Sequence, residues 1–500
     1  MTEEVLVVGA GPVGLTMATE LARYRVPVRV IEKAAARSET SKALVIWSRT
    51  LELIDRMGCA DTFVSAGFRA VAANVVAGGA QIGRIALDTV DSPYPYALML
   101  PQCETERLME LQLSAHGVRV ERQVELIGFA QAPDQVSARL RHVDGREETV
   151  ETPWLIGCDG AHSAVRHGLG VPFEGETLPS SWFLADVRLT GVPTPPDELA
   201  IYWHADGVLA LFPISPGRYR IVADIGSAPP GSPQSDPTLE EIQGVLDARG
   251  PGDIQGSEPL WLSRFTINER KVADYRAGRV FLVGDAAHIH SPAGGQGMNT
   301  GMQDAFNLAW KLALAIRRLA APEPLLGSYS AERSEVGRKV LADAGNLTRL
   351  AMIRGRLEQG LRNRIGSLVF GLAPVRRAMS NTMAELSIGY PKSPLTATHG
   401  PRLAGPAAGA RTPVRTPGAP VGAGDAPRFA LCAQATLDSA ALIARHGDLL
   451  SPEIRAPLEK DGVWLVRPDG YVAATAAQGD WARIGAYLDR IAGASAGTAG

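Results

Sequence analysis

Three glycines near the N-terminus have the spacing of a turn that binds a pyrophosphate. Gly9, Gly11 and Gly14 form the pattern G-x-G-x-x-G, and Pro12 follows the second glycine. The first glycine permits a tight turn, the second lets a pyrophosphate approach the backbone, and the third lets helix and strand pack closely. The N-terminus of the following helix would offer free N–H groups and a partial positive charge to the phosphates.

An acidic residue stands where such a site would bind a ribose. Glu32 ends a second apolar segment, residues 28–31, and its carboxylate could accept both hydroxyls of an adenosine ribose. The apolar strand 5–8, the glycine turn, the helix 16–23 and the second strand occur in the order of a βαβ unit. This order favours a dinucleotide site, and the alternative is an ordinary βαβ unit with a glycine turn.

Two later segments repeat the sequence of strand, glycine turn and helix. Residues 154–166 contain the turn Asp159-Gly160, in which Asp159 is placed to cap the helix. Residues 279–283 form an apolar strand that ends at Gly284-Asp285, and a glycine-rich loop from Ser291 leads into a long helix. The glycines of that loop would bring backbone N–H groups close to a ligand.

The elements that must position these turns follow from the hydrophobic pattern. We expect an amphipathic helix at 49–57, antiparallel strands within 70–100, a helix that opens at Gln102, and strands at 118–126, 136–142 and 149–158. Residues 173–266 are predicted to be mostly strands, interrupted by a helix at 239–248. Residues 397–427, rich in Pro, Gly and Ala, indicate a linker, after which a small α/β unit has a strand at 463–466. The tail 492–500 is predicted to be disordered.

Composition bounds the class of protein. At 500 residues the chain has room for two or three domains, and a net charge of −3 favours neither nucleic acid nor an anionic membrane as a partner. The acidic start leads directly into the first strand, so we expect no signal peptide. The apolar helix at 305–321 contains three basic residues and is predicted to be a core helix. Four scattered cysteines without a C-x-x-C pair fit a cytoplasmic chain with reduced thiols, and no residue cluster predicts a metal.

Taken together, the three glycine turns resemble those of the class A flavoprotein aromatic hydroxylases, the para-hydroxybenzoate hydroxylase and phenol hydroxylase superfamily. The chain is most similar to the branch that hydroxylates aromatic polyketides, phenols or antibiotics, and the resemblance covers residues 3–390. It implies an α/β fold with a Rossmann-like FAD-binding domain at 1–75, 100–180 and 265–390. An inserted β-sheet substrate-binding domain would occupy 76–99 and 181–264. Residues 391–500 would be a linker and a truncated thioredoxin-like domain, without C-x-x-C and with a structural role.

The resemblance also implies roles for individual residues. The glycine turn and Glu32 would hold the ADP half of FAD, the Asp159 turn would serve FAD and NAD(P)H, and Asp285 would bind the ribityl chain. The carbonyl of Pro292 would approach the flavin C4a, and no side chain is assigned as a base. Lys42 stands where many relatives have arginine, and Leu44 where phenol hydroxylases have a catalytic aspartate. The predicted cofactor-binding residues are Gly9, Gly11, Pro12, Gly14, Glu32, Lys33, Lys42, Gln102, Arg107, Val124, Asp159, Gly160, Asp285, Gly295, Gly297, Met298 and Asn299.

The predicted activity is that of an FAD-dependent, NAD(P)H-consuming monooxygenase. It would hydroxylate a phenolic or polyketide-like aromatic molecule through a flavin C4a-hydroperoxide, with FAD bound non-covalently and NADPH or NADH as co-substrate. A homodimer is left open. The side chains considered for proton transfer are Tyr202, His204, Arg218 and Tyr219, and the aromatics considered for the substrate cavity or the core are Trp47, Trp182, Trp203 and Phe212.

Other functions remain as alternatives. A flavin-dependent halogenase of this fold would need a Trp-x-Trp-x-Ile-Pro segment, which the sequence lacks. A flavin reductase acting on isoprenoid chains is a second enzyme reading. The alternative of a different class is a non-catalytic protein that holds FAD structurally while it sequesters a drug or polyketide, and the intact loop 292–299 favours catalysis over it.

Overall fold

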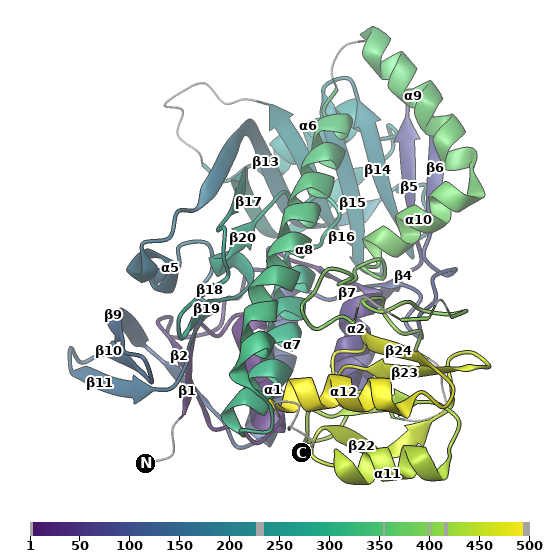
Figure 1. Ribbon diagram of the computed structural model, residues 1–500. Helices are drawn as coiled ribbons and strands as arrows, with labels where there is room; N and C mark the ends of the chain where they lie inside the picture. The colour runs from purple at the N-terminus through teal and green to yellow at the C-terminus, as the bar shows by residue number, and fades with distance from the viewer. Residues whose placement is uncertain are drawn as a thin grey trace, which may run out of the picture.

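The computed structural model describes residues 4–226, 235–353, 356–397, 400–401, 403–414 and 419–493 (Figure 1), with only the main chain described at 356 and 357. The part of the predicted disordered tail beyond Gly493 lies outside these ranges. Among the described residues no helix is long and apolar enough to cross a membrane. Nor does that part of the chain contain a group of three or more His, Cys, Asp or Glu side chains that could hold a metal ion.

The first layer is a mostly parallel sheet with β1, the first strand of the chain, in its interior and β18 as an antiparallel edge strand. The strand order is β18-β19-β12-β1-β2-β8, and β1 pairs in parallel with both β12 and β2. All four side chains of β1 are buried, as expected for a strand covered on both faces. The bounds are β1 Val5–Val8, β2 Val28–Glu32, β8 Val120–Arg122, β12 Leu155–Gly157, β18 Arg276–Ala277 and β19 Val280–Leu282.

Helices cover this sheet. The three turns lie together at one edge, because they follow the parallel strands β1, β12 and β19. α1 packs against α7 and α4, and a separate sheet, β11-β10-β9, lies at the outer side (Figure 1). The helices are α1 Pro12–Arg23, α2 Ser48–Arg56, α3 Ala60–Ala66, α4 Gln102–Ala115, α5 Ala164–Leu169, α7 Gly297–Ile316 and α8 Pro322–Ala351, with a short 3₁₀ turn η1 at Gly284–Ala286. The outer strands are β9 Val124–Gln131, β10 Val136–His142 and β11 Glu147–Thr152.

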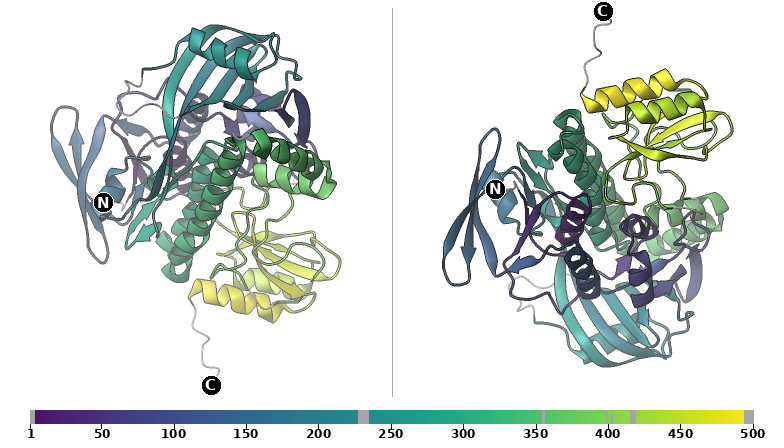
Figure 2. Two further views of the ribbon diagram at one scale, coloured as in Figure 1. Left: turned by 90° about the horizontal axis from the view of Figure 1, so that it is seen from above. Right: turned by 90° about the horizontal axis from the view of Figure 1, so that it is seen from below.

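The second layer is an eight-stranded sheet in the order β20-β17-β13-β16-β15-β14-β5-β6. One face packs against α6 (Leu239–Arg249), and α9 (Arg356–Gly371) and α10 (Ala373–Met383) contact its edge strand β6 (Figure 2). The strands are β5 Ala72–Ala77, β6 Ala80–Ala86, β13 Glu174–Thr190, β14 Glu198–His204, β15 Gly207–Ser215, β16 Arg218–Gly226, β17 Gln255–Lys271 and β20 His288–Ile289.

The prediction for residues 70–100 was only partly right. β5 and β6 are antiparallel to each other, but β5 pairs in parallel with β14. The last strand of the segment, β7 (Ala97–Met99), belongs instead to a small sheet with β3 (Val45–Ile46) and β4 (Phe68–Ala70). Pairing partners from distant parts of the chain decide strand direction, and the local pattern does not contain them.

A four-stranded sheet with two helices forms the C-terminal unit, drawn in yellow-green and yellow in Figure 1. Its strand order is β22-β21-β23-β24, and it lies beside α7 and α8. The backbone N–H of Ala321 bonds to the carbonyl of Ile491 at 3.0 Å, which joins the end of α12 to the start of α8. The elements are β21 Phe429–Cys432, α11 Leu437–Arg445, β22 Leu450–Arg455, β23 Gly462–Val466, β24 Val472–Ala477 and α12 Trp481–Ala492.

Candidate active site

The glycine turn between β1 and α1 is open at its second glycine. A Cβ atom added at Gly9 would lie 2.5 Å from the carbonyl oxygen of Cys158, and one at Gly14 would lie 1.9 Å from the carbonyl oxygen of Gly9. A Cβ atom at Gly11 would meet nothing within 4 Å. The first and third glycines are therefore required for packing, whereas the second, followed by Pro12 at the start of α1, faces a space into which a ligand can come.

Glu32, at the end of β2, is held beside this turn by two backbone groups. Its Oε2 accepts a hydrogen bond from the N–H of Ala10 at 2.9 Å, and its Oε1 accepts one from the N–H of Ala34 at 2.9 Å. Each oxygen keeps a further lone pair, so the oriented carboxylate can still accept ribose hydroxyls. The N–H of Gln123 bonds to the carbonyl of Ala34 at 3.4 Å, which places Val124 near the same loop.

The Asp159-Gly160 turn packs directly against the first glycine of the motif, since the added Cβ there would lie 3.0 Å from the Cα of Asp159. The expectation that Asp159 caps α5 was partly wrong, because Ser163 is the cap and accepts the N–H of Arg166 at 2.9 Å. Asp159 adds a bond from the N–H of Val165 at 3.1 Å. Its other oxygen is buried without a hydrogen-bond partner, which leaves an acceptor available to a ligand.

Asp285 lies on η1 with its carboxylate open to solvent and without a hydrogen bond to any described residue. Burial by the surrounding protein raises the pKa of Asp285, whereas His288 and Lys42 act to lower it. Lys42, which is also exposed, acts on the pKa of this carboxylate from loop 34–44.

Trp47 holds the glycine-rich loop before α7. Its indole N–H lies 3.0 Å from the carbonyl oxygen of Gly294, where φ is +88°, and 3.2 Å from that of Gly295, where φ is +62°. The N–H of Gly295 bonds to the carbonyl of Pro292 at 2.9 Å, so this carbonyl closes a turn. No side chain caps α7, and the N–H groups of its first turn, which begins at Gly297, therefore have no side-chain partner from a cap.

The side chain of Asn299 is used inside the protein. It accepts the backbone N–H of Trp47 at 2.9 Å and donates to the carbonyls of Val45 at 2.8 Å and Gly295 at 3.1 Å. The residue is fully buried, whereas Met298 before it is half-buried. Because both amide N–H donors are occupied, any contact of Asn299 with a ligand is left to its main chain and to the remaining lone pair of its side-chain oxygen.

The remaining predicted residues are less close to these turns. Gln102 begins α4, accepts the N–H of Ala43 at 3.3 Å and donates to Glu106 at 2.9 Å, so it borders loop 34–44. Arg107 is part-exposed and pairs with Glu104, with 2.7 Å from Nε to Oε2. Lys33 is exposed.

A buried acid that the sequence analysis did not single out connects the turn before Asp285 to helices α7 and α8. Asp304 on α7 accepts the N–H of Gly284 at 3.1 Å, lies 2.7 Å from Nε2 of His288 and accepts Nε of Arg333 at 2.5 Å. Burial would raise the pKa of Asp304, but Arg333 and His288 hold it below its ordinary value. Arg333 also donates to the carbonyl of Thr300 at 3.0 Å. The sequence contained one signal for this acid: Asp304 and Lys311 are charged residues within α7, a helix that is otherwise mostly apolar.

A second unassigned acid lies against the first turns of α7. Glu385 is fully buried, accepts the hydroxyl of Thr300 at 3.3 Å and accepts the side-chain amide of Gln303. Among the described residues no arginine, lysine or histidine donates a hydrogen bond to it, and burial raises the pKa of Glu385 to about 8. It follows α10, and nothing in its local sequence indicated burial.

The four side chains considered for proton transfer do not meet at the three turns. Tyr202 and Tyr219 lie in the apolar cluster formed with α6, and Arg218 donates to the carbonyl of Glu258 at 2.6 Å on the surface. Tyr202 and His204 line a cavity of about 540 Å³ together with Thr194, but none of the predicted cofactor residues lines it. The tyrosines pack beside α6 because successive side chains of β14 and β16 point to opposite faces of the sheet. A shift of one residue in register would place them on the other face.

The aromatic residues, by contrast, share one apolar cluster on the other face of the eight-stranded sheet. Trp47, Trp182 and Trp203 are buried there, and Phe212 packs against them. Met379 and Met383 of α10 pack against the same cluster. The indole N–H of Trp182 is buried without a hydrogen-bond partner. An unpaired donor in an apolar environment is suited to an acceptor on a bound aromatic molecule.

Comparison with known proteins agrees with this geometry. A family model described as an FAD binding domain matches residues 2–344. The 6-methylpretetramide 4-monooxygenase of Streptomyces rimosus is 41% identical over 412 residues, which are 80% of this chain and 72% of that protein. The rifampicin monooxygenase of Streptomyces venezuelae is 37% identical over 68% of this chain and 69% of its own length. The solved anhydrotetracycline hydroxylase of Streptomyces rimosus superposes with a TM-score of 0.80 at 30% identity, over 99% of this chain and 100% of that one.

Proposed function

This chain belongs to the FAD binding domain family of flavin-dependent aromatic monooxygenases, and from that premise we propose that it hydroxylates a polyketide-like aromatic molecule. The observation that supports this most strongly is the set of three turns that follow the neighbouring strands β1, β12 and β19 at one edge of the same sheet. Gly11 offers an open backbone, and the oriented carboxylate of Glu32 and the exposed side chain of Asp285 have no charged bonding partner among the described residues.

The residues present fit FAD. The open position at Gly11 suits the pyrophosphate, and Glu32 suits the adenosine ribose, since a carboxylate accepts paired hydroxyls. Asp285, whose carboxylate makes no hydrogen bond to the described residues, suits the ribityl hydroxyls. When bound, FAD supplies the electron transfer from NAD(P)H and the activation of O₂ that hydroxylation requires.

The chain's own residues orient the cofactor and stabilise charge. We assign the N–H groups of the first turn of α7 to the pyrimidine end of the flavin, where the helix N-terminus stabilises negative charge. Trp47 and Asn299 hold the preceding loop in place. His290, which donates its Nδ1 proton to the carbonyl of Ser291 at 2.8 Å, stays neutral because burial lowers its pKa to about 4.

The proposed substrate is electron-rich and largely apolar. The cluster of Trp47, Trp182, Trp203 and Phe212 offers aromatic surface on the face of the sheet to which α10 also contributes. We assign no side chain as a base. The ring would therefore be activated by its own hydroxyl or carbonyl substituents, as in aromatic polyketides.

The experiment is a substrate screen with a mass readout. Purified FAD-loaded protein is mixed with NADPH or NADH and with anhydrotetracycline, rifampicin or simple phenols, and the oxidation of the reduced nicotinamide is followed. We expect one aromatic class to accelerate oxidation and to acquire one oxygen atom from ¹⁸O₂. A protein that binds these compounds and FAD without accelerated oxidation would be a binding protein, and the proposal would be wrong.

Several further assignments are part of the same proposal. We divide the chain into an FAD-binding domain at 1–75, 100–180 and 265–390, a substrate-binding domain at 76–99 and 181–264, and a C-terminal unit at 391–500. The four-stranded sheet with helices α11 and α12 supports a thioredoxin-like origin of that unit. We further propose a cytoplasmic enzyme, with non-covalent FAD and no nucleic-acid partner. Activity of the purified protein with each nicotinamide decides between NADPH and NADH. Its molecular mass in solution decides whether it is a homodimer.

A further inference from the structure

The turn between β23 and β24 in the C-terminal unit packs against helices α2, α7 and α8 of the part of the chain assigned to FAD. This turn, Arg467-Pro-Asp-Gly470, is rigid, because the N–H of Gly470 bonds to the carbonyl of Arg467 at 2.9 Å. The side chain of Arg467 is further fixed by Asp469, with 2.9 Å from Nε to Oδ1. Both side chains are buried, although both are charged. A buried charged turn requires partners, and these come from outside the unit.

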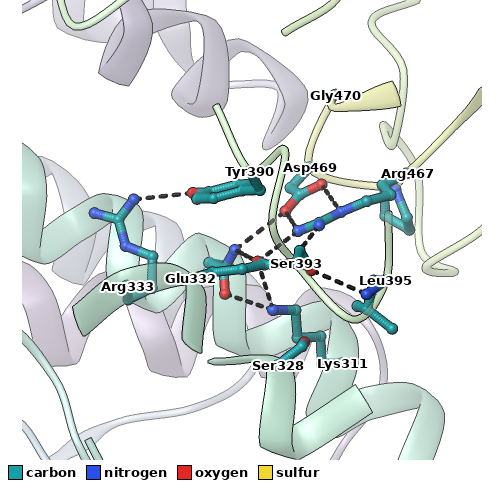
Figure 3. A network of polar contacts seen from close by, with 12 residues as sticks. Lys311, Ser328, Glu332, Arg333, Tyr390, Ser393, Leu395, Arg467, Asp469 and Gly470 are labelled. Carbon is teal, nitrogen blue, oxygen red and sulfur yellow. Dashed lines mark hydrogen bonds and ion pairs between the residues drawn. The ribbon is translucent and has the colours of Figure 1, made fainter. Parts of the chain in front are cut away.

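The principal partner is Glu332 on α8 (Figure 3). Arg467 donates to both of its oxygens, at 2.6 and 2.9 Å. Lys311 on α7 lies 2.8 Å from Glu332, and Asn307 donates to it at 2.6 Å. The side chains of Arg467, Lys311 and Glu332 are at most 1% exposed. Burial alone would raise the pKa of Glu332, but Arg467 and Lys311 hold it far below its ordinary value.

The next residue of α8 continues the network to the cofactor turns. Arg333 pairs with Asp304 and donates to the carbonyl of Thr300 in the first turn of α7. Asp304 in turn accepts the N–H of Gly284, the residue before Asp285. The network therefore extends from the C-terminal turn to the two segments assigned to the ribityl chain and the flavin ring.

Tyr390 forms a second connection between the two arginines. Its hydroxyl accepts a hydrogen bond from Arg333 at 2.9 Å, and the guanidinium of Arg467 lies 5.1 Å from the centre of its ring (Figure 3). The turn also contacts α2, because Arg49 donates to the carbonyl of Asp469 at 2.6 Å. α2 follows Trp47 directly, and Trp47 holds the glycine-rich loop.

We propose that Arg467 is a positioning residue for FAD, which acts through Glu332 and Arg333 on the Asp285 turn and the N-terminus of α7. Within this network Lys311, Arg333 and Arg467 face Asp304, Glu332 and Asp469, so three cations balance three buried carboxylates, and removal of Arg467 alone leaves one negative charge in excess. Loss of Arg467 leaves a buried carboxylate underneutralised, and relaxation of α8 against α7 is the available response. The C-terminal unit thereby sets the affinity for a cofactor whose predicted binding residues all lie outside it.

The test compares Arg467→Met and Arg467→Lys with a matched control in the same unit. The control is Arg445→Met, which removes an exposed pair with Asp489 at 2.8 Å. Each protein is measured without FAD for thermal unfolding, then titrated with FAD at a temperature where the apoprotein is folded. The visible circular dichroism of the bound flavin serves as a spectroscopic readout of its orientation.

We expect Arg467→Met to raise the dissociation constant for FAD on the order of tenfold, equal to about 1.4 kcal/mol. The flavin circular dichroism should change as well, and Arg467→Lys should lie between it and the wild type because the charge is kept but the paired contact is lost. The control should stay within about twofold of wild type. A folded Arg467→Met or Arg467→Lys protein with unchanged FAD affinity and spectrum would overturn the inference.

If Arg467→Met does not fold, Arg467→Lys decides alone. Absence of FAD binding in the wild-type protein would contradict the proposed function instead, so the two failures are distinguishable.

Discussion

Replacement of Asp285 by alanine should weaken FAD binding without destabilising the apoprotein. The carboxylate makes no hydrogen bond to any described residue, and burial raises its pKa above the ordinary value. A carboxyl group with a raised pKa in the folded state favours folding only at low pH, so above its folded pKa the ionised group is a cost to the apoprotein. Alanine removes that cost at pH 7, and the apoprotein should melt at the same or a slightly higher temperature.

The magnitude for the cofactor follows from the bonds that would be lost. A hydrogen bond to a charged group contributes about 1.5–3 kcal/mol, which corresponds to an increase in the dissociation constant of about 10- to 150-fold. Asp285→Asn keeps one acceptor oxygen without the charge, and its affinity should lie between those of the wild type and Asp285→Ala. The assay is a titration of apoprotein with FAD, followed by flavin fluorescence, together with thermal unfolding of the apo and loaded forms.

Asp304 provides the matched comparison, because it lies on α7 close to the same turn but is fully buried. It is bonded to Gly284, His288 and Arg333. Asp304→Asn breaks a buried ion pair, for which the cost is about 3–5 kcal/mol, so the melting temperature should fall with and without FAD. If Asp285→Ala instead lowered the melting temperature of the apoprotein and left FAD affinity intact, Asp285 would be a turn residue and its assignment to the ribityl chain would be refuted.

Three further predictions concern the same site. Gly11→Ala should leave the apoprotein folded but reduce FAD affinity, whereas Gly14→Ala should prevent normal folding, since its Cβ would lie 1.9 Å from a carbonyl oxygen. Circular dichroism and FAD titration separate the two variants, and equal behaviour of both would contradict the assignment of Gly11 to the pyrophosphate. Glu32→Ala should weaken FAD binding and also lower apoprotein stability, because two backbone N–H groups lose their acceptor; an unchanged FAD dissociation constant would remove Glu32 from the site. Burial raises the pKa of Glu385 to about 8, so the folded protein loses stability as the pH rises from about 5 to 8 and the favoured proton is given up in the unfolded state. Glu385→Gln has no such proton, and its stability relative to wild type should increase by at most about 1.4 kcal/mol per pH unit over this range. Denaturant unfolding across that pH range tests this, and a constant difference would show that Glu385 is ionised in the folded protein.

Local sequence was sufficient wherever a function depends on contiguous residues. The helix predicted at 49–57 is α2, the strand at 463–466 is β23, and the helix at 239–248 is α6 with one additional residue. The glycine turn with Glu32, the Asp159 turn and the Asp285 turn each follow a buried strand as predicted. These patterns are short, and their physical reasons, such as the positive φ of Gly9, act within a few residues.

The local pattern could not show which side chains have hydrogen-bond or packing partners within the protein. Asn299 is predicted to contact the flavin ring, and the partners of its amide donors, Val45 and Gly295, were visible only in the structure. Asp159 shares its capping role with Ser163. Tyr202 and Tyr219 were considered for proton transfer, and they instead pack with α6. Each outcome depends on a partner that arrives from elsewhere in the chain or on the face that a strand presents.

The sequence by itself therefore determined the family, the FAD cofactor and the three turns, because each rests on residues that lie next to one another. Tertiary structure alone decided the buried network that joins them, since Asp304, Glu332, Arg333 and Arg467 are separated by up to 163 positions in the chain and have no common local pattern. A charge within an apolar segment indicates that a partner must exist, because an unpaired buried charge is too costly. Which partner it is depends on which elements pack together, and here the packing of the C-terminal turn against α7 and α8 made that choice.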